Sequence, residues 1–340
     1  MRLGKITETV WKKNIGKVLQ VADRCGCLST SACPESTGVV TVSTCVSGAS
    51  PKTACCGILS VLNELAIKGA RPEGILLRML LPETVEENWL RQAAEAIKAL
   101  CEETGACQEQ VVRINIDAEV LPSVYLPVVS VTVVGEKIPE NSQEDKNREK
   151  AGAGQSIILL GTVGLEGALR VLDEREPELA KRFVPAFLEQ AKRLNSQLYA
   201  VPWIEMARKS GATAMKQITE GGIFAALWEL TEEAETGMET ALSKISICQE
   251  TVEICEYFHL NPYQMTSAGS VLMLTKQEDK LLGVLQAAGA RAEKLGVTTE
   301  AAERVILGQS EKRYLDRPAP DELVLWRKRE MSGSCPIKQM

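Results

Sequence analysis

One strongly polar stretch, GEKIPENSQEDKNREKAGAGQS (residues 135–156), divides the sequence and most constrains the fold. It is rich in charge and poor in large apolar residues, which is typical of a linker or a long loop. On each side of it, β-branched or alternating apolar segments interleave with segments of helical periodicity. A chain of 340 residues also exceeds what one hydrophobic core usually fills. The sequence therefore predicts an α/β or α+β protein with domains at 1–140 and 151–315 and a tail at 316–340.

The same patterns predict individual elements in both halves. Before the polar stretch we expect an amphipathic N-terminal helix, strands at residues 38–46, 110–117 and 125–135, and helices at 53–68 and 83–105. After it we expect strands at 156–164 and 269–275, with ELVLW (322–326) as a further strand. Helices are expected at 178–194, 199–211, 245–260 and 278–296, and one more after the turn at 219–222.

Composition excludes two classes of partner. A net charge of -6, a pI near 5.3 and only 4% aromatic residues argue against binding of nucleic acid, because a polyanion is repelled and stacking platforms are few. The N-terminal stretch MRLGKITETVWKKNIGKV has no continuous apolar core, so neither a signal peptide nor a membrane span is expected there. We therefore expect a cytoplasmic protein without membrane contact.

Three short motifs are candidates for chemistry. TEGGIFAALWEL places Thr219, Gly221 and Gly222 where a helix begins, a geometry that offers backbone N–H groups to a phosphate; close packing of two chain segments explains the glycines equally well. In ILSVLNELAIKGARPEGI, Asn63 and Glu64 flank the apolar stripe of a helix, where an acid is usually just solvated. In NIDAEVLP, Asp117 ends a strand, a position that suits a metal or phosphate ligand and also an ordinary turn.

The order and spacing of these motifs resemble the superfamily of aminoimidazole ribonucleotide (AIR) synthetase, selenophosphate synthetase and thiamine monophosphate kinase, and within it the HypE-like group. NELAIKGARP is similar to the Asn-Asp-Leu-Ala, Gly-Ala-x-Pro segment, and IDAEVLP to Gly-Asp-Thr-Glu/Lys-Val-x-Pro. GTVGLEGAL is similar to Gly-Thr-x-Gly-x-His-Gly, and KQITEGGIFAALWEL to Arg-Asp-Pro-Thr-Arg-Gly-Gly with its helix. The segment EICEYFHLNPYQMTSAG resembles Cys-Glu-x-x-Gly-Leu-Asp-Pro followed by Asn-Glu-Gly.

The resemblance implies a PurM-like fold and a homodimer in which the N-terminal domains pair their sheets. It also implies ATP and Mg²⁺ in a cleft, used to activate an amide- or carbamoyl-type oxygen. Carried over by motif, the nucleotide-binding residues would be Asn63, Glu64, Asp117, Thr219, Gly221 and Gly222, and the metal ligands Glu64 and Asp117. Such chemistry depends on carboxylates for Mg²⁺ and cations for the phosphates. A small-molecule or nucleotide ligand and a maturation partner protein are expected with it.

The sequence departs from this pattern at charged positions. Ser43, Thr44 and Cys45 stand in the stretch where the family places metal-binding aspartates. Gln217 and Glu220 replace the aspartate and the arginine of the turn. Ala268 replaces the glutamate of Asn-Glu-Gly. The turn is thus expected to keep the shape of a phosphate site and to have lost much of its charge.

Cysteines form a second group of candidates. Cys25, Cys27 and Cys33 lie close together in the sequence, but without paired C-x-x-C spacing or a nearby histidine they favour free thiols over a metal site. Cys55 and Cys56 begin a helix, where a thiolate is stabilised unless the thiols are buried. Cys335 stands five residues from the C-terminus, and an incidental tail thiol is favoured over a group-accepting one.

Two hypotheses follow from the sequence. The first is an ATP-dependent, HypE-like enzyme with a remodelled nucleotide site. The second is a catalytically silent relative, a dimeric scaffold or binding protein that retains the fold. The first predicts saturable binding of Mg²⁺-ATP that weakens on Asp117→Asn, and the second predicts a dimer that binds no nucleotide.

Overall fold

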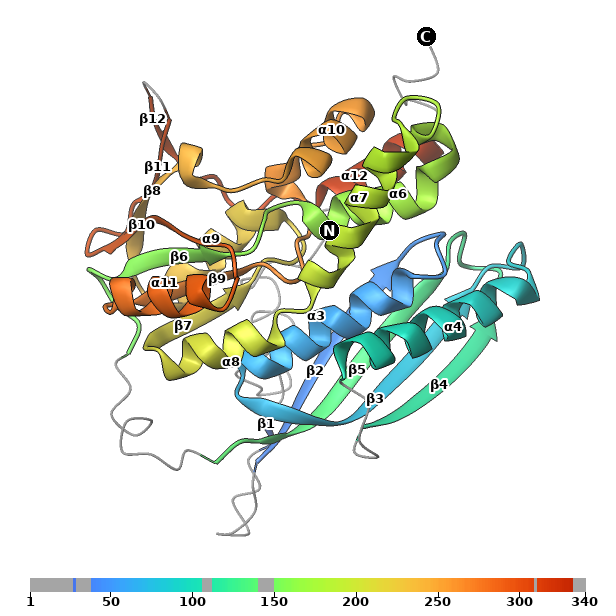
Figure 1. The fold of residues 1–340 in the computed structure, drawn as a ribbon, viewed down its shortest axis with the longest axis horizontal. Coiled ribbons are helices and arrows are strands. Elements are labelled where there is room, and N and C mark those ends of the chain that lie inside the picture. Colours follow the sequence, from blue (N-terminus) through green and yellow to red (C-terminus); the bar gives the residue numbers. More distant parts are fainter. Residues whose placement is uncertain (1–26, 29–37, 106–111, 140–149, 309–310, 333–340) are drawn as a thin grey trace.

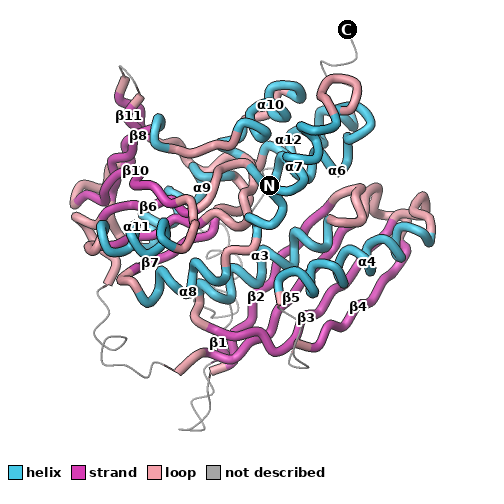
Figure 2. Tube along the Cα trace, viewed as in Figure 1, coloured by secondary structure: helices cyan, strands magenta, loops and turns pink. Residues whose placement is uncertain are grey.

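The computed structural model describes residues 27–28, 38–105, 112–139, 150–308 and 311–332, and it contains two sheets (Figure 1). The first sheet has five strands in the order β1-β2-β5-β3-β4, all antiparallel except the β3–β4 pair. Two helices, α3 and α4, lie along one face of this sheet (Figure 2). We call this part the first lobe. Its bounds are β1 (Cys27–Leu28), β2 (Val39–Ser47), α3 (Thr53–Ile67), β3 (Ala70–Leu81), α4 (Glu87–Thr104), β4 (Arg113–Val120) and β5 (Val128–Lys137).

The other face of the first sheet, which we call the open face, is uncovered in the described part of the chain. Alternation explains the difference: Leu77 and Met79 of β3 are buried under the helices, whereas Leu76 and Arg78 point to the open face and are about half exposed. Most of the neighbouring open-face side chains on β2 and β5 are polar, and Ser43 and Thr132 share a hydrogen bond of 2.8 Å there. One face of this sheet is therefore core and the other is available to solvent or to a partner.

The second sheet has seven strands in the order β12-β11-β8-β10-β6-β9-β7, with one parallel pair, β8–β11. We call this sheet and its helices the second lobe. Its strands are β6 (Ser156–Leu160), β7 (Ala212–Gln217), β8 (Gly237–Ala241), β9 (Val271–Thr275), β10 (Ala292–Thr299), β11 (Arg304–Leu307) and β12 (Lys312–Tyr314). Its helices are α6 (Leu165–Leu179), α7 (Pro185–Arg193), α8 (Val201–Lys209), α9 (Gly222–Glu233), α10 (Gln249–Phe258), α11 (Glu278–Ala287) and α12 (Glu322–Met331), with 3₁₀ turns η2 (Leu194–Leu198), η3 (Leu242–Lys244) and η4 (Pro262–Gln264).

Both faces of the central strands in the second sheet are covered, which explains their continuous apolar sequences. In β6, Ile157 and Leu159 pack with α9, whereas Ile158 and Leu160 pack with α8 and α11. A strand buried on both faces loses the alternation of a half-buried strand. The predictions of a buried strand beginning at Ser156 and of an α/β fold are confirmed, but the strand ends at Leu160 rather than at 164.

The two lobes share one core. Its largest cluster joins the covered face of the first sheet to residues of α6, α7, α10 and α12, including Leu172, Phe258 and Trp326. Helix α3 also packs against α8 of the second lobe (Figure 1). Because apolar burial is continuous across the boundary, the two lobes are held in a fixed relation.

Several predicted elements are confirmed and several are corrected. The strand ELVLW is wrong: residues 322–326 begin α12, with Leu323 and Trp326 buried at helical spacing. The helix at 178–194 is divided, since α6 ends at Leu179 and α7 begins at Pro185. The helix at 278–296 ends at Ala287 and is followed by β10, and β3 was not predicted. The predicted N-terminal helix lies outside the described residues.

Candidate functional site

A cavity of about 80 Å³ lies between the two lobes, and we call it the interlobe cavity. The first lobe contributes the end of β2 and Ser60 of α3. The second lobe contributes the turn before α9, Thr266, and residues of α6 and α12. Its polar and charged lining is Thr44, Cys45, Ser47, Ser60, Glu166, Arg170, Thr219, Glu220, Thr266, Asp321 and Arg327.

The 219–222 turn has the backbone geometry of an anion site. Gly221 and Gly222 both have left-handed backbone angles, with φ of 86° and 68°. A Cβ at Gly222 would lie 2.3 Å from the carbonyl oxygen of Tyr263, so close packing also requires glycine here. The two glycines thus combine left-handed backbone angles, which suit an anion-binding turn, with close packing against another chain segment.

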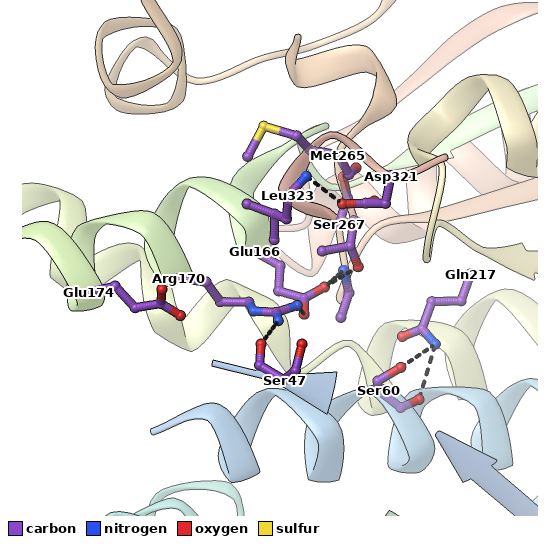
Figure 3. A network of polar contacts seen from close by, with 12 residues as sticks. Ser47, Ser60, Glu166, Arg170, Glu174, Gln217, Met265, Ser267, Asp321 and Leu323 are labelled. Carbon is purple, nitrogen blue, oxygen red and sulfur yellow. Dashed lines mark hydrogen bonds and ion pairs between the residues drawn. The ribbon is translucent and has the colours of Figure 1, made fainter. Parts of the chain in front are cut away.

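An anion already occupies this turn, and it comes from the chain itself. The backbone N–H of Gly221 donates a hydrogen bond of 3.0 Å to Oδ2 of Asp321. The other carboxylate oxygen, Oδ1, accepts from the N–H of Leu323 at 2.9 Å and so caps α12 (Figure 3). One buried carboxylate therefore joins the N-terminal ends of α9 and α12.

The environment of Asp321 opposes its ionisation. Asp321 is 3% exposed, and burial raises the pKa of its carboxyl group to about 6. The N–H groups of Leu323 and Gly221 and the charge of Arg170 lower the pKa, while the charge of Glu166 adds to the rise. The carboxylate is thus ionised at neutral pH and sensitive to mild acid.

The two guanidinium groups at the cavity are each committed to a glutamate. Arg170 pairs with Glu166 at 3.4 Å and donates to the carbonyl oxygen of Ser47 at 2.8 Å (Figure 3). Arg327 pairs with Glu174 at 2.6 Å. Both arginines also donate to Ser47 and so link α6 and α12 to the end of β2. Because both are paired with glutamates, the cavity has little positive charge left for a triphosphate.

Glu166 provides a carboxylate that the sequence motifs place elsewhere. Its Oε2 accepts from the N–H of Ala268 at 2.9 Å and from the hydroxyl of Thr266 at 2.6 Å. The motif comparison puts a histidine at position 166 and a glutamate at position 268. Glu166 thus brings a carboxylate from α6 to the segment that contains Ala268.

Asn63 lies at the lobe boundary rather than in the cavity. Its amide donates to the carbonyl oxygen of Leu198 at 2.8 Å and accepts from the N–H of Ala200 at 2.9 Å, and the residue is fully buried. Gln217 makes a similar link, because its amide donates to the carbonyl oxygen of Ser60 at 3.0 Å. Both amides hold α3 against the second lobe.

The two predicted metal ligands do not meet within one chain. Glu64 is on α3, 3.8 Å from Lys68 at the next turn of the helix. Asp117 pairs with Arg78 at 2.6 Å on the open face, so the sheet separates it from α3. No group of three His, Cys, Asp or Glu side chains in the described ranges could hold a metal ion. The residues present do not form a magnesium site by themselves.

Of the six predicted binding residues, only Thr219 is among the side chains that line the cavity. Gly221 and Gly222 shape the turn beside it, while Asn63, Glu64 and Asp117 lie away from it. Glu166, Arg170, Asp321 and Arg327 also line the cavity and were not predicted from the sequence. Two signals were present: the Glu166 to Arg170 spacing of one helical turn, and an aspartate directly before a helix-forming run.

Of the described cysteines, Cys55 and Cys56 at the start of α3 are buried thiols, whereas Cys45 is exposed. Burial raises the pKa of Cys55 to about 12 and raises that of Cys56 further. Cys45 lines the cavity, and its pKa is raised by burial and by the charge of Glu220. Cys25, Cys33 and Cys335 and the side chain of Cys27 lie outside the described residues.

The chain matches the family model described as AIR synthase related protein, C-terminal domain, over residues 152–308. It is 27% identical to a Methanocaldococcus jannaschii protein named for hydrogenase expression or formation, over 78% of this chain and 76% of that protein. It is 26% identical to the carbamoyl dehydratase HypE of Rhodobacter capsulatus, over 72% of this chain and 67% of the relative.

Solved structures have the same fold. Escherichia coli HypE aligns with a TM-score of 0.64 and 16% identity, covering 92% of this chain and 91% of that one. A HypE structure in complex with ATP aligns with a TM-score of 0.58 and 13% identity, covering 95% and 98%. The HypE–HypF complex aligns with a TM-score of 0.57 and 18% identity, covering 82% and 90%. At these identities the likeness establishes the PurM-like architecture.

Across the described residues, no helix combines the length and the apolar character that crossing a membrane requires.

Proposed function

Since residues 152–308 match the AIR synthase related C-terminal domain and the chain is similar to HypE proteins, we propose that it belongs to the AIR synthase-related, HypE-like family and is an ATP-dependent enzyme acting on an amide- or carbamoyl-type group, with a remodelled nucleotide site. One observation carries the proposal: the 219–222 turn holds an anion through the N–H of Gly221, even though that anion is the chain's own Asp321. A backbone donor at the start of a helix suits a phosphate oxygen as well as a carboxylate oxygen. The turn therefore keeps its capacity for anions although Glu220 stands where the family has arginine.

In this proposal, Thr219 and the backbone N–H of Gly221 hold a phosphate group, while Gly222, whose N–H donates to the carbonyl oxygen of Thr219 at 3.0 Å, shapes the turn. Asn63 acts by fixing the position of α3 against the second lobe. Asp117 lies on the open face and Glu64 lies on α3, so neither carboxylate is part of the cavity. In this proposal they act on the nucleotide from outside the cavity. Magnesium would enter as the ATP complex, held mainly by phosphate oxygens and water.

We further propose a homodimer formed through the open face. Among the described residues of one chain nothing covers this face, which carries Leu76 and Val39, 49% and 39% exposed. Its polar groups, such as Ser43 and Thr132, can pair across an interface. A second copy would also bring its own charges toward Asp117. Light scattering of the purified chain tests this proposal: a mass of twice 37.0 kDa supports it, and a monomer contradicts it.

The likeness to HypE suggests a partner of the HypF type and a cytoplasmic place in hydrogenase maturation. Co-purification with a HypF-like protein is the observation to seek. If each protein elutes from a size-exclusion column at the same volume in the mixture as alone, at micromolar concentration, the result would count against this partner.

Calorimetric titration with ATP, with and without Mg²⁺, tests the central proposal. We expect saturable binding that weakens on Asp117→Asn. Glu119→Gln is the matched control, because Glu119 pairs with the same Arg78 on the same face and belongs to no nucleotide-binding residue set. Absence of any heat of binding up to millimolar ATP would contradict an ATP-dependent function.

A second candidate is a catalytically silent dimer that serves as a scaffold. The size of the cavity favours it, since about 80 Å³ is well below the ~300–1,000 Å³ of ordinary ligand pockets. Its two guanidinium groups are also paired already. A stable dimer that binds neither ATP nor pyrophosphate would establish this candidate in place of the first.

A further inference from the structure

The chain's own C-terminal helix covers the turn that would bind a phosphate. Asp321 stands at the start of α12 and accepts the N–H of Gly221 at 3.0 Å. The residue is 3% exposed, so this is an interior contact and not a surface one. The preceding segment follows the same path, because the carbonyl oxygen of Ala319 lies 3.1 Å from where a Cβ of Gly221 would be.

Helix α12 is fixed in this place by its own burial. Leu323 and Trp326 are 3% and 1% exposed and belong to the core cluster shared by both lobes. Arg327 pairs with Glu174 of α6. The contact at Gly221 is therefore backed by apolar packing and one buried ion pair.

A phosphate and Asp321 cannot use the turn together. Both would accept the same N–H of Gly221, and the cavity beside it holds about 80 Å³. Two anions at one backbone site also repel each other, more strongly here than in water because the site is buried. Arg170, which lines the same cavity, is already paired with Glu166.

We propose that α12 is an intramolecular competitor of anionic ligands: Asp321 occupies the anion position of the 219–222 turn, and a ligand phosphate binds there only when Asp321 withdraws. The inference rests on the proposed function for the identity of the ligand, a nucleotide phosphate. It adds the regulation of that site: affinity for phosphate is set by how firmly α12 is seated. Any partner that draws α12 away would raise this affinity.

The test compares binding of inorganic pyrophosphate and of ATP to matched variants at pH 7.5. Asp321→Ser keeps a side-chain oxygen that can cap α12 at Leu323, but it is too short to bridge to Gly221. Asp321→Asn keeps the volume and the cap, while its amide can turn an N–H instead of an oxygen toward Gly221. Asp316→Ser removes the same charge from an exposed position in the preceding segment and is the control.

We expect pyrophosphate to bind both Asp321 variants at least about tenfold more tightly than the unaltered protein or Asp316→Ser. A factor of this size corresponds to the free energy of one competing hydrogen bond. Circular dichroism and thermal melting identify any variant that has lost its fold. The inference is overturned if folded Asp321→Asn or Asp321→Ser binds pyrophosphate no better than the unaltered protein.

The ATP titrations separate this inference from the proposed function. Equal ATP binding in all variants would overturn the competitor role and leave ATP binding intact. Tighter pyrophosphate binding without any ATP binding would support the competitor role and contradict the proposed function. No binding of either ligand to any variant would overturn both.

Discussion

The interlobe cavity and the open face of the first sheet use the same pair of chemical groups in different surroundings. In the cavity, Glu166 and Arg170 are separated by 3.4 Å and their side chains are 3% and 12% exposed. On the open face, Arg78 and Asp117 are only 2.6 Å apart, yet their side chains are 55% and 61% exposed. The shorter pair is the weaker one, because water screens it, whereas loss of a buried partner leaves a charge without solvation.

This difference also divides the roles of the two regions. The cavity's arginines are paired with glutamates of α6 and also contact Ser47 of the first lobe, and its turn is filled by Asp321. The open face keeps charges that a second chain or a ligand can recruit at small cost. In our proposals, the buried region holds the fold and regulates anion binding, and the exposed region mediates association.

The largest effect is expected for the buried pair. Glu166→Gln leaves Arg170 without its counter-charge in a buried place, and we expect the free energy of unfolding to fall by about 3–5 kcal/mol. Glu119→Gln makes the same change beside Arg78 on the open face and should cost less than about 1 kcal/mol. Urea denaturation of both variants measures the difference, and equal losses would contradict the comparison.

The next effect concerns Asp321 and pH. Its pKa is raised from 3.8 to about 6, so the native state binds this proton more tightly than the unfolded chain does. The stabilising contribution of the protonated group is therefore complete below about pH 4 and is lost as pH rises through about 6, by roughly 3 kcal/mol in all. Arg170 and Glu166 face the carboxyl group and act in opposite directions on its pKa.

Asp321→Asn should remove this part of the pH dependence. We expect the variant to gain stability relative to the unaltered protein between pH 4 and 7, while Asp316→Asn, at an exposed position, follows the unaltered curve. Denaturation at several pH values tests this expectation. Parallel curves for Asp321→Asn and the unaltered protein would show that Asp321 titrates normally.

A smaller loss is expected at the lobe boundary. Asn63→Ala leaves the carbonyl oxygen of Leu198 and the N–H of Ala200 without their partner, which should cost about 2 kcal/mol. Asn195→Ala, at an exposed position of the neighbouring η2 turn, should cost less than about 0.5 kcal/mol. If both substitutions lower the free energy of unfolding equally, the hydrogen bonds of Asn63 do not stabilise the contact between the lobes.

The smallest effect belongs to Asp117 itself. Asp117→Asn breaks an exposed pair with Arg78, so we expect a change in unfolding free energy below about 1 kcal/mol. A larger loss, measured by the same denaturation, would mean that Asp117 is buried in the protein's solution state, as in a dimer through the open face. Repeating the measurement at several protein concentrations distinguishes these cases.

Sequence patterns predicted the elements whose burial is regular. Val39–Ser47 and Thr53–Ile67 were predicted within a residue or so, because one alternates and the other has a continuous apolar stripe. The strand Ala70–Leu81 was missed because Pro72 and Gly74 mark its beginning with loop residues, and they produce a shift of register against β5. The strand predicted at ELVLW was wrong, because five mostly apolar residues fit the period of a helix as well as that of a strand.

The site was harder to predict than the fold, for a physical reason. Motif positions located the turn, and Thr219 does line the cavity. Its actual anion, Asp321, comes from a hundred residues further along the chain, and no local pattern joins the two. Tertiary contacts of this kind depend on how α12 packs, which a single sequence does not reveal.

The pH titration of the Gly221 amide proton by nuclear magnetic resonance tests the central claim most directly. If Asp321 holds this N–H, the Gly221 signal shifts with a midpoint near pH 6, the pKa of that carboxyl group, and the shift disappears in Asp321→Asn. A Gly221 signal that stays constant between pH 4 and 8 in the unaltered protein would contradict the claim that the turn is filled by the chain's own carboxylate.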